Sequence, residues 1–445
     1  MNPNMIGDRA VVLGGSMAGL LAARVLADAY NRVTVVDRDD LSDSVAPRQG
    51  VPQGRHIHGL IARGGQILDE LLPGFTESLT ARGVPTMDQL RDARLYFSGH
   101  RLRQADSGVV VLSASRPCLE AHVRARVRSL PGVTFADRRD ILGLVTTQDR
   151  ARVIGAHVIP RADGGTEEIV HADLVVDATG RGSRLPLWLE DVGYGRPAEE
   201  KVRTRVGYAT GVFRLRPDAL GHDKAVIAAP TPAHPRGEGL AMIEGQRHVV
   251  TLMGILGDRP PTDLAGFLDF AKSLHVSDVY DAIVDAEPLD EIVGFGFPAS
   301  LRRRYERMRR FPDGLLVVGD AVCSLNPIYG QGMSVAAIEA ITLRVHLDLG
   351  CEPRPRKVLR DMAKAIDVPW DMAIGADLAF PGVEGPRPVK ARMANAYIPR
   401  LHAAAADNAW LGAEFLRVAG LIKRPGALFR PGVVMKVLRH SLRHA

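Results

Sequence analysis

The 445-residue sequence predicts an α/β protein: a parallel Rossmann-like sheet, an inserted antiparallel sheet and a helical C-terminal region. Residues 9–39 contain an apolar run, a Gly-rich turn, an apolar-faced helix and a second apolar run, which together indicate a βαβ unit. Residues 314–336 repeat the order strand, turn and helix. Residues 202–212 alternate apolar and polar side chains, as antiparallel strands do. Beyond residue 346 the chain is rich in Ala, Leu and Arg at helical spacing.

Composition excludes several classes of protein. Hydrophobic residues at 46% and charged residues at 24% are ordinary for a globular chain, and the length suits two or three domains. The net charge is +6, but the arginines are scattered and aromatics are only 5%, so we expect no nucleic-acid partner. Cys118, Cys323 and Cys351 lack metal or disulfide spacing. With no signal peptide or transmembrane segment apparent, we expect a cytoplasmic protein without a metal.

The βαβ unit carries a dinucleotide-binding fingerprint with one departure. Gly14, Gly15 and Gly19 form the turn into the helix, but Ser16 stands where the pattern has its middle glycine. The serine is small and its hydroxyl could bind a phosphate. Asp37 follows Gly14 by 23 residues, near the spacing of the acid that binds ribose hydroxyls. The predicted cofactor contacts here are Gly14, Gly15, Ser16, Met17, Ala18, Gly19, Asp37 and Arg38.

The second strand–turn–helix segment predicts a phosphate-and-sugar site. Leu315–Val318 forms a buried strand, and Asp320 lies at its carboxyl end, where ligands of open α/β sheets bind. We expect Asp320 to accept a hydrogen bond from a ribityl or ribose hydroxyl and the amides of residues 330–333 to face a diphosphate. An ordinary structural turn is the alternative. The predicted contacts are Asp320, Pro327, Gly330, Gln331, Gly332 and Met333.

Three stretches resemble a known family. GDAVCSLNPIYGQGM, residues 319–333, resembles the second FAD-contact motif of the class A flavoprotein monooxygenases. APRQGVPQGRHIHGL, residues 46–60, resembles a loop of the squalene-epoxidase-like branch and of bacterial polyether epoxidases. DATGRGS, residues 177–183, is similar to that branch's version of the turn after a buried strand. The resemblance covers most of residues 9–345.

The resemblance implies FAD as cofactor, held in a para-hydroxybenzoate hydroxylase-like domain. On that analogy Arg48 contacts the flavin or the diphosphate, Arg116 reaches the diphosphate, and Asp177, Thr179 and Gly180 form a cofactor-binding turn. NADPH or NADH would bind transiently as electron donor, or a separate flavin reductase would supply electrons. His56 and His58 are either FAD-loop residues or packing residues. A metal at this pair is disfavoured because the sequence nearby offers no third ligand.

The predicted domain organisation divides the FAD-binding domain among residues 1–90, 106–190 and 299–345. Residues 91–105 and 191–298 supply the substrate domain, and residues 346–445 form the helical region, with helices at 355–378, 389–410, 411–423 and 432–443. We expect residues 202–212 to form one strand with a solvent-exposed face. The apolar face of the inserted sheet is interpreted as the roof of a substrate pocket, with Tyr208, Met242, Met253, Phe295 and Phe297 as lining residues.

The resemblance implies a FAD-dependent monooxygenase. In that family reduced FAD and O₂ form a C4a-hydroperoxide, which delivers one oxygen atom, so the protein needs no acid–base triad. The expected substrate is a bulky apolar alkene or polyketide-like molecule of bacterial secondary metabolism, which is epoxidised or hydroxylated. Two alternatives remain: a redox-neutral cyclase of the [4+2] cycloaddition type that uses FAD structurally, and a prenyl-reductase-type flavoprotein. The lysine and Trp-x-Trp motif of flavin-dependent halogenases is absent from the sequence, which argues against chlorination.

Overall fold

The computed structural model describes residues 5–42, 45–162 and 164–444. Its central element is a five-stranded sheet in the order β20-β11-β1-β2-β7, in which every neighbouring pair is parallel. The strands are β1 (Gly7–Leu13), β2 (Tyr30–Val36), β7 (Val133–Ala136), β11 (Leu174–Asp177) and β20 (Leu315–Val317). Both predicted strand–turn–helix segments contribute strands to it, which confirms the α/β fold class.

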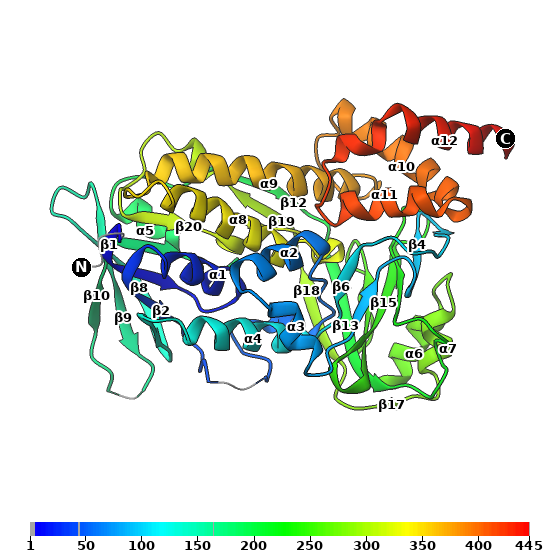
Figure 1. Ribbon diagram of the computed structural model, residues 1–445, viewed down its shortest axis with the longest axis horizontal. Coiled ribbons are helices and arrows are strands. Elements are labelled where there is room, and N and C mark those ends of the chain that lie inside the picture. The colour runs from blue at the N-terminus through cyan, green and yellow to red at the C-terminus, as the bar shows by residue number, and fades with distance from the viewer. Residues whose placement is uncertain (1–4, 43–44, 163, 445) are drawn as a thin grey trace.

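Both faces of the parallel sheet are covered. Side-chain alternation along β1 sends Ala10 and Val12 into one apolar core and Val11 and Leu13 into another. The first core contains helices α1 (Met17–Leu26), α2 (Ala62–Leu71), α3 (Phe75–Thr80), α4 (Arg116–Arg128) and α8 (Gly332–Leu347). The second contains the sheet β8 (Arg139–Thr146), β9 (Val153–Pro160) and β10 (Glu168–His171), with helices α5 (Leu185–Asp191) and α9 (Pro355–Asp377). Figure 1 shows α1, α8 and α9 stacked in that order.

An eight-stranded sheet forms the other half of the molecule. Its order is β17-β13-β16-β15-β14-β4-β5, and β18 also pairs with β13. All its neighbours are antiparallel except β14 and β4. β15 and β16 form a hairpin, with Gly245 in its turn at φ 71°. The strands are β4 (Ala93–Phe97), β5 (His100–Arg101), β13 (Val206–Arg214), β14 (Ala225–Ala228), β15 (Arg236–Ile243), β16 (Arg247–Gly254), β17 (Glu287–Pro288) and β18 (Val293–Phe297).

The prediction of a single half-solvated strand over residues 202–212 was wrong. Val202 ends β12 (Glu199–Val202), which pairs with β19 (Ser300–Arg303) in a separate sheet with β21 (Cys323–Ser324). β13 begins at Val206 and both its faces are covered. Ala209 and Phe213 pack with helices α6 (Leu264–Lys272) and α7 (Asp278–Ile283), while the opposite face meets a cavity. Tertiary packing therefore covers the face of β13 that the alternating sequence predicted to be exposed to solvent.

The helical C-terminal region is confirmed. After α9 come α10 (Val389–Asp407), α11 (Ala409–Ala419) and α12 (Pro431–Arg443), close to the predicted helices. In Figure 1 these orange and red helices lie over the end of the eight-stranded sheet, beside β4. Leu401 and Leu416 share an apolar core with Leu95 of β4. Within the described ranges, no helix combines the length and apolar content needed to cross a membrane.

Candidate functional site

One cavity of about 2300 Å³ lies between the parallel sheet, the eight-stranded sheet and the C-terminal helices. It is larger than the roughly 300–1,000 Å³ of most small-molecule pockets, so it has room for more than one bound molecule. Most residues predicted to bind cofactor or substrate line it: Gly14, Ser16, Met17, Ala18, Asp37, Arg38, Arg48, Arg116, Thr179, Gly180, Tyr208, Met253, Phe295, Phe297, Asp320, Pro327, Gly330, Gln331, Gly332 and Met333.

Two helices begin at this cavity with free backbone amides. The N-cap residues are Ser16 for α1 and Gln331 for α8, and neither side chain makes a capping hydrogen bond among the described residues. The first helical hydrogen bonds run from Leu20 N to Ser16 O and from Val335 N to Gln331 O, so the amides in the first turn of each helix have no partner within the helix. Aligned free amides and the positive end of a helix dipole favour an anion. A diphosphate would meet both features.

The turn before α1 depends on two glycines. Gly14 has φ 106°, and a Cβ there would lie 2.4 Å from the Ala178 carbonyl oxygen. A Cβ on Gly19 would lie 1.8 Å from the carbonyl oxygen of Gly14. The close approach of helix to turn therefore excludes any side chain at either position.

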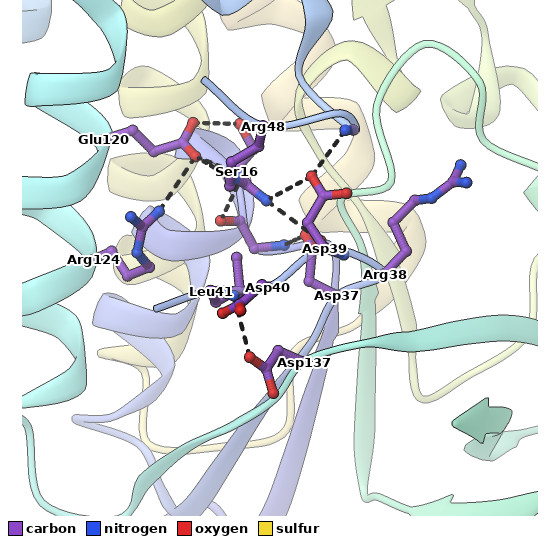
Figure 2. A network of polar contacts seen from close by, with 12 residues as sticks. Ser16, Asp37, Arg38, Asp39, Asp40, Leu41, Arg48, Glu120, Arg124 and Asp137 are labelled. Atoms are coloured by element: carbon purple, nitrogen blue, oxygen red, sulfur yellow. Dashed lines mark hydrogen bonds and ion pairs between the residues drawn. The ribbon is translucent and has the colours of Figure 1, made fainter. Parts of the chain in front are cut away.

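A buried carboxylate organises the arginines at this end of the cavity (Figure 2). Glu120 on α4 accepts hydrogen bonds from Arg48 Nε at 3.0 Å, Arg116 Nη2 at 3.0 Å and Ser16 Oγ at 2.9 Å. Arg124 Nη1 lies 3.6 Å from it. Burial alone would raise the pKa of Glu120, but Arg116 and Arg48 hold it below its usual range.

Arg48 connects this cluster to the acid at the end of β2. Its Nη1 lies 3.3 Å from Asp37 Oδ1 and 3.2 Å from Asp39 Oδ2. The other oxygen of Asp37 accepts from the Gly15 amide at 2.6 Å. Burial raises the pKa of Asp37, and Arg48 opposes that shift. Asp37 is thus held at the carboxyl end of its strand, where the spacing rule for a ribose-binding acid expects it.

At the α8 end, Asp320 lines the cavity between two cations. Burial raises the pKa of Asp320, while Arg116 and Arg181 lower it. Arg181 also lies 4.8 Å from the ring centre of Phe297 and donates to Ser324 Oγ at 3.0 Å. The Oε1 of Gln331 is buried without a hydrogen-bond partner in the described structure. An unpaired buried acceptor in a cavity wall is expected where a ligand supplies the donor.

A second polar network holds the turn after Asp320. Asp377, at the end of α9, accepts from Asn326 Nδ2 and from the Tyr329 hydroxyl, both at 2.8 Å. Asn326 Oδ1 in turn accepts from the Ile328 amide at 3.2 Å and lies 3.5 Å from the Tyr208 hydroxyl. Burial raises the pKa of Asp377 to about 6. This network ties the helical region to the turn that carries Pro327.

The two loop histidines are uncharged; His56 is buried and His58 is half-buried. His56 lines the cavity between the rings of Tyr208 and Phe295, at centroid distances of 6.0 and 5.3 Å. Burial and then Arg55 lower the pKa of His56 to about 4. Burial and then Arg116 lower the pKa of His58 to about 3, and its Nδ1 lies 2.8 Å from the His56 carbonyl oxygen. At neutral pH neither histidine adds positive charge to the site.

Four predicted site residues do not line the cavity. Gly15 and Gly19 act through the turn, and Asp177 uses both carboxylate oxygens inside its own turn, accepting from Thr179 and Ser183. Met242 was predicted to line the substrate pocket and does not. It shares the strand face of Leu240, which packs toward α6 and α7, because successive side chains of a strand alternate between faces. Arg116 is the first residue of α4.

Sequence reasoning missed several residues that shape the site. Glu120 could have been found, since Arg116, Glu120 and Arg124 follow each other at the four-residue spacing of helical ion pairs. Asp377 had no such signal, because its partners lie about 50 residues away in the chain. The α10 and α11 side chains in the cavity wall, among them Asn395 and Phe415, were likewise visible only in the fold.

One group in the described ranges has metal-binding composition: Asp407, His440 and His444, on the surface away from the cavity. His440 Nε2 lies 3.0 Å from Asp407 Oδ2, within hydrogen-bonding distance. The absence of a metal from the cofactor cavity stays a prediction.

The free helix N-termini, the acidic strand ends and the large adjoining cavity define a dinucleotide-binding flavoprotein. Residues 9–352 match the family model described as FAD binding domain, and the chain belongs to that family. It is 36% identical to protein Rv3254 of Mycobacterium tuberculosis over 98% of this chain and 94% of that protein. It is 28% identical to a kynurenine 3-monooxygenase of Salinispora tropica over 76% of this chain and 72% of that protein.

Solved structures show the same fold. The flavin-dependent brominase Bmp2 superposes with a TM-score of 0.69 at 16% identity, over 99% of this chain and 100% of that chain. PqsL of Pseudomonas aeruginosa, described as a probable FAD-dependent monooxygenase, superposes with a TM-score of 0.56 at 17% identity, over 92% and 99% of the two chains. These neighbours belong to the class A flavin monooxygenase and halogenase group. At such identities they establish the fold and not the reaction.

Proposed function

We propose that this protein is an FAD-dependent monooxygenase, an epoxidase or hydroxylase, whose substrate is bulky and largely apolar. The observation that carries the proposal is one continuous cavity, which joins the end with the free helix N-termini to a largely apolar chamber. The chamber walls include Leu95, Ile227 and Ile398, from both the eight-stranded sheet and α10. Such walls suit the alkene or polyketide-like substrate expected from the squalene-epoxidase-like motifs.

The residues present fit FAD. The amides at the starts of α1 and α8 would hold the diphosphate, Asp37 would accept from the ribose, Asp320 would accept from the ribityl chain, and Arg116 would balance the phosphate charge. When bound and reduced, FAD would supply the activation of O₂. The protein positions the substrate and excludes water, which the closely packed rings of Tyr208, Phe295 and Phe297 support.

An anaerobic reduction experiment tests the proposal. The full chain is purified with FAD, mixed with NADPH or NADH without air, and followed by the visible absorbance of the flavin. Bleaching, followed by reoxidation on admitting O₂ and by incorporation of labelled oxygen into an apolar alkene, is the expected result. Bleaching only with an added flavin reductase would assign the electron donor to a partner.

Two other functions predict different outcomes. A redox-neutral cyclase would turn over its substrate with no reductant and no O₂. A prenyl-reductase-type flavoprotein would consume reductant and reduce its substrate without O₂. If the protein retains FAD but neither NADPH, NADH nor an added flavin reductase bleaches the flavin, the monooxygenase proposal is contradicted.

A further inference from the structure

His56 is a cavity-lining polar residue that the proposed chemistry leaves unused, and a buried series of hydrogen bonds holds it. Its Nδ1 lies 2.7 Å from Thr210 Oγ1, which lies 2.7 Å from Thr251 Oγ1. The Ile57 amide donates to Thr251 Oγ1 at 3.1 Å. Thr210 and Thr251 are paired across β13 and β16 and are 1% and 0% exposed. This series of hydrogen bonds thus starts at the Ile57 amide and ends at the His56 imidazole.

The direction of each hydrogen bond in this series follows from the Ile57 amide. Because Thr251 accepts from that amide, its own hydroxyl hydrogen needs an acceptor, and Thr210 Oγ1 is its hydroxyl partner within the described residues. Thr210 then donates to His56 Nδ1. The reverse direction would leave the Thr251 hydrogen buried and unpaired, which is costly. Nδ1 is therefore the acceptor of the ring.

The remaining ring nitrogen is the donor. His56 is neutral at pH 7, because burial and Arg55 lower its pKa to about 4, so it carries one N–H, on Nε2. Nε2 has no hydrogen-bond partner in the described part of the chain and is not among its fully buried unpaired atoms. The ring lies beside Tyr208 and Phe295, which line the apolar chamber.

We propose that His56 is a substrate-positioning residue that presents Nε2–H as a fixed donor in the substrate chamber, and that the substrate carries an oxygen acceptor that pairs with this donor. This inference rests on the proposed function, since the molecule that meets the donor is the substrate of that reaction. A carbonyl, ether or hydroxyl oxygen can accept a hydrogen bond from Nε2–H, whereas a pure hydrocarbon cannot. A donor inside a largely apolar chamber favours a ligand that can pair with it.

Two probes of equal shape test the acceptor requirement. 2-Acetylnaphthalene and 2-isopropenylnaphthalene differ in a carbonyl oxygen against a methylene group. Each is titrated into the FAD-loaded full chain, and binding is followed by perturbation of the flavin spectrum. We expect the ketone to bind about fivefold more tightly, as one net hydrogen bond provides. In His56→Phe, which keeps an aromatic ring, the preference should fall to near unity.

A matched control is His248→Phe. His248 is also buried and lies on β16 with Thr251, but its side chain does not line the cavity. This variant should keep the ketone preference. Equal binding of the two probes by the unmodified protein, or a preference that survives in His56→Phe, would overturn the inference.

The tautomer of His56 provides a readout that needs no ligand. Long-range ¹H–¹⁵N spectra of histidine-labelled protein, assigned with His56→Gln, should show the Nε2–H form at pH 7. Thr210→Val should change that ring's signals, since it removes the hydroxyl donor to Nδ1. An Nδ1–H ring or an imidazolium would overturn the inference, even if neither probe binds. Flavin reduction by NADPH on the same sample separates this failure from a failure of the proposed function.

Discussion

The hydroxyl of Ser16 donates to Glu120 at 2.9 Å and lies 2.9 Å from Arg116 Nη2, although Ser16 occupies the fingerprint position where a second glycine is usual. The sequence suggested that this hydroxyl could bind a phosphate. In the structure it joins a carboxylate and a guanidinium, as Figure 2 shows for its contact with Glu120. Glu120 and Arg116 of α4 therefore accommodate the serine side chain, and the backbone amides at the start of α1 remain free for a ligand.

The first prediction concerns Ser16→Gly. Glu120 keeps Arg48 and Arg116 as partners without the serine hydroxyl, so FAD affinity should change by less than about threefold, within the range of one weak hydrogen bond. Titration of apoprotein with FAD, followed by quenching of flavin fluorescence, measures it. A tenfold loss would show that the hydroxyl contacts a phosphate after all.

The second prediction concerns Glu120→Ala. This change leaves the Arg48 and Arg116 guanidinium groups buried without their shared carboxylate, so we expect a loss of about 3–5 kcal/mol in the free energy of unfolding. Denaturant unfolding measures the loss. Glu70→Ala is the control, because Glu70 pairs with Arg344 at the surface and should cost at most about 1 kcal/mol. Similar losses in both variants would contradict the organising role of Glu120.

The third prediction concerns Gly19→Ala. The new Cβ would lie 1.8 Å from the Gly14 carbonyl oxygen, which is backbone and cannot move aside without opening the turn. We expect soluble protein without bound FAD, or no folded protein. Gly65→Ala in α2 is the control, since a Cβ there has no neighbour within 4 Å and should stabilise the helix by about 0.5–1 kcal/mol. The visible absorbance of the purified variants measures their bound FAD. A Gly19→Ala protein that carries FAD would show that the turn can accommodate a Cβ at residue 19.

The fourth prediction is a pH dependence at Asp377. Its pKa is about 6 in the folded protein against 3.8 as reference, so folding favours the protonated form. The associated stability is complete below pH 3.8 and is lost as pH rises through about 6, which amounts to about 3 kcal/mol. Asp377→Asn removes the ionisation and keeps an acceptor for Asn326 and Tyr329.

The unfolding free energy of Asp377→Asn relative to the unmodified protein should therefore rise between pH 4 and pH 8. Urea unfolding at several pH values measures this difference. Parallel curves for the two proteins would mean that Asp377 ionises normally despite its burial.

Local sequence determined the proposed cofactor-binding end of the cavity. The glycines of the first turn, Asp37 after β2 and Asp320 after β20 lie where a strand–turn–helix pattern places them, because backbone hydrogen bonding and side-chain size act over a few residues. The helical C-terminal region was equally predictable, since its apolar spacing recurs every three to four residues. Glu120 could also have been predicted, from its four-residue spacing to Arg116 and Arg124.

Only the tertiary structure decided the proposed substrate-binding end of the cavity. Thr210 and Thr251 meet because β13 and β16 pair in one register, and a shift of either strand by one residue would turn its threonine to the opposite face of the sheet. Met242 faces away from the cavity, and β13 has no solvated face, because α6 and α7 cover that side of the sheet. Asp377 reaches Asn326 across 51 residues of chain. Such contacts depend on how whole elements pack, and the alternation of residues along one strand does not say which of its two faces a helix will cover.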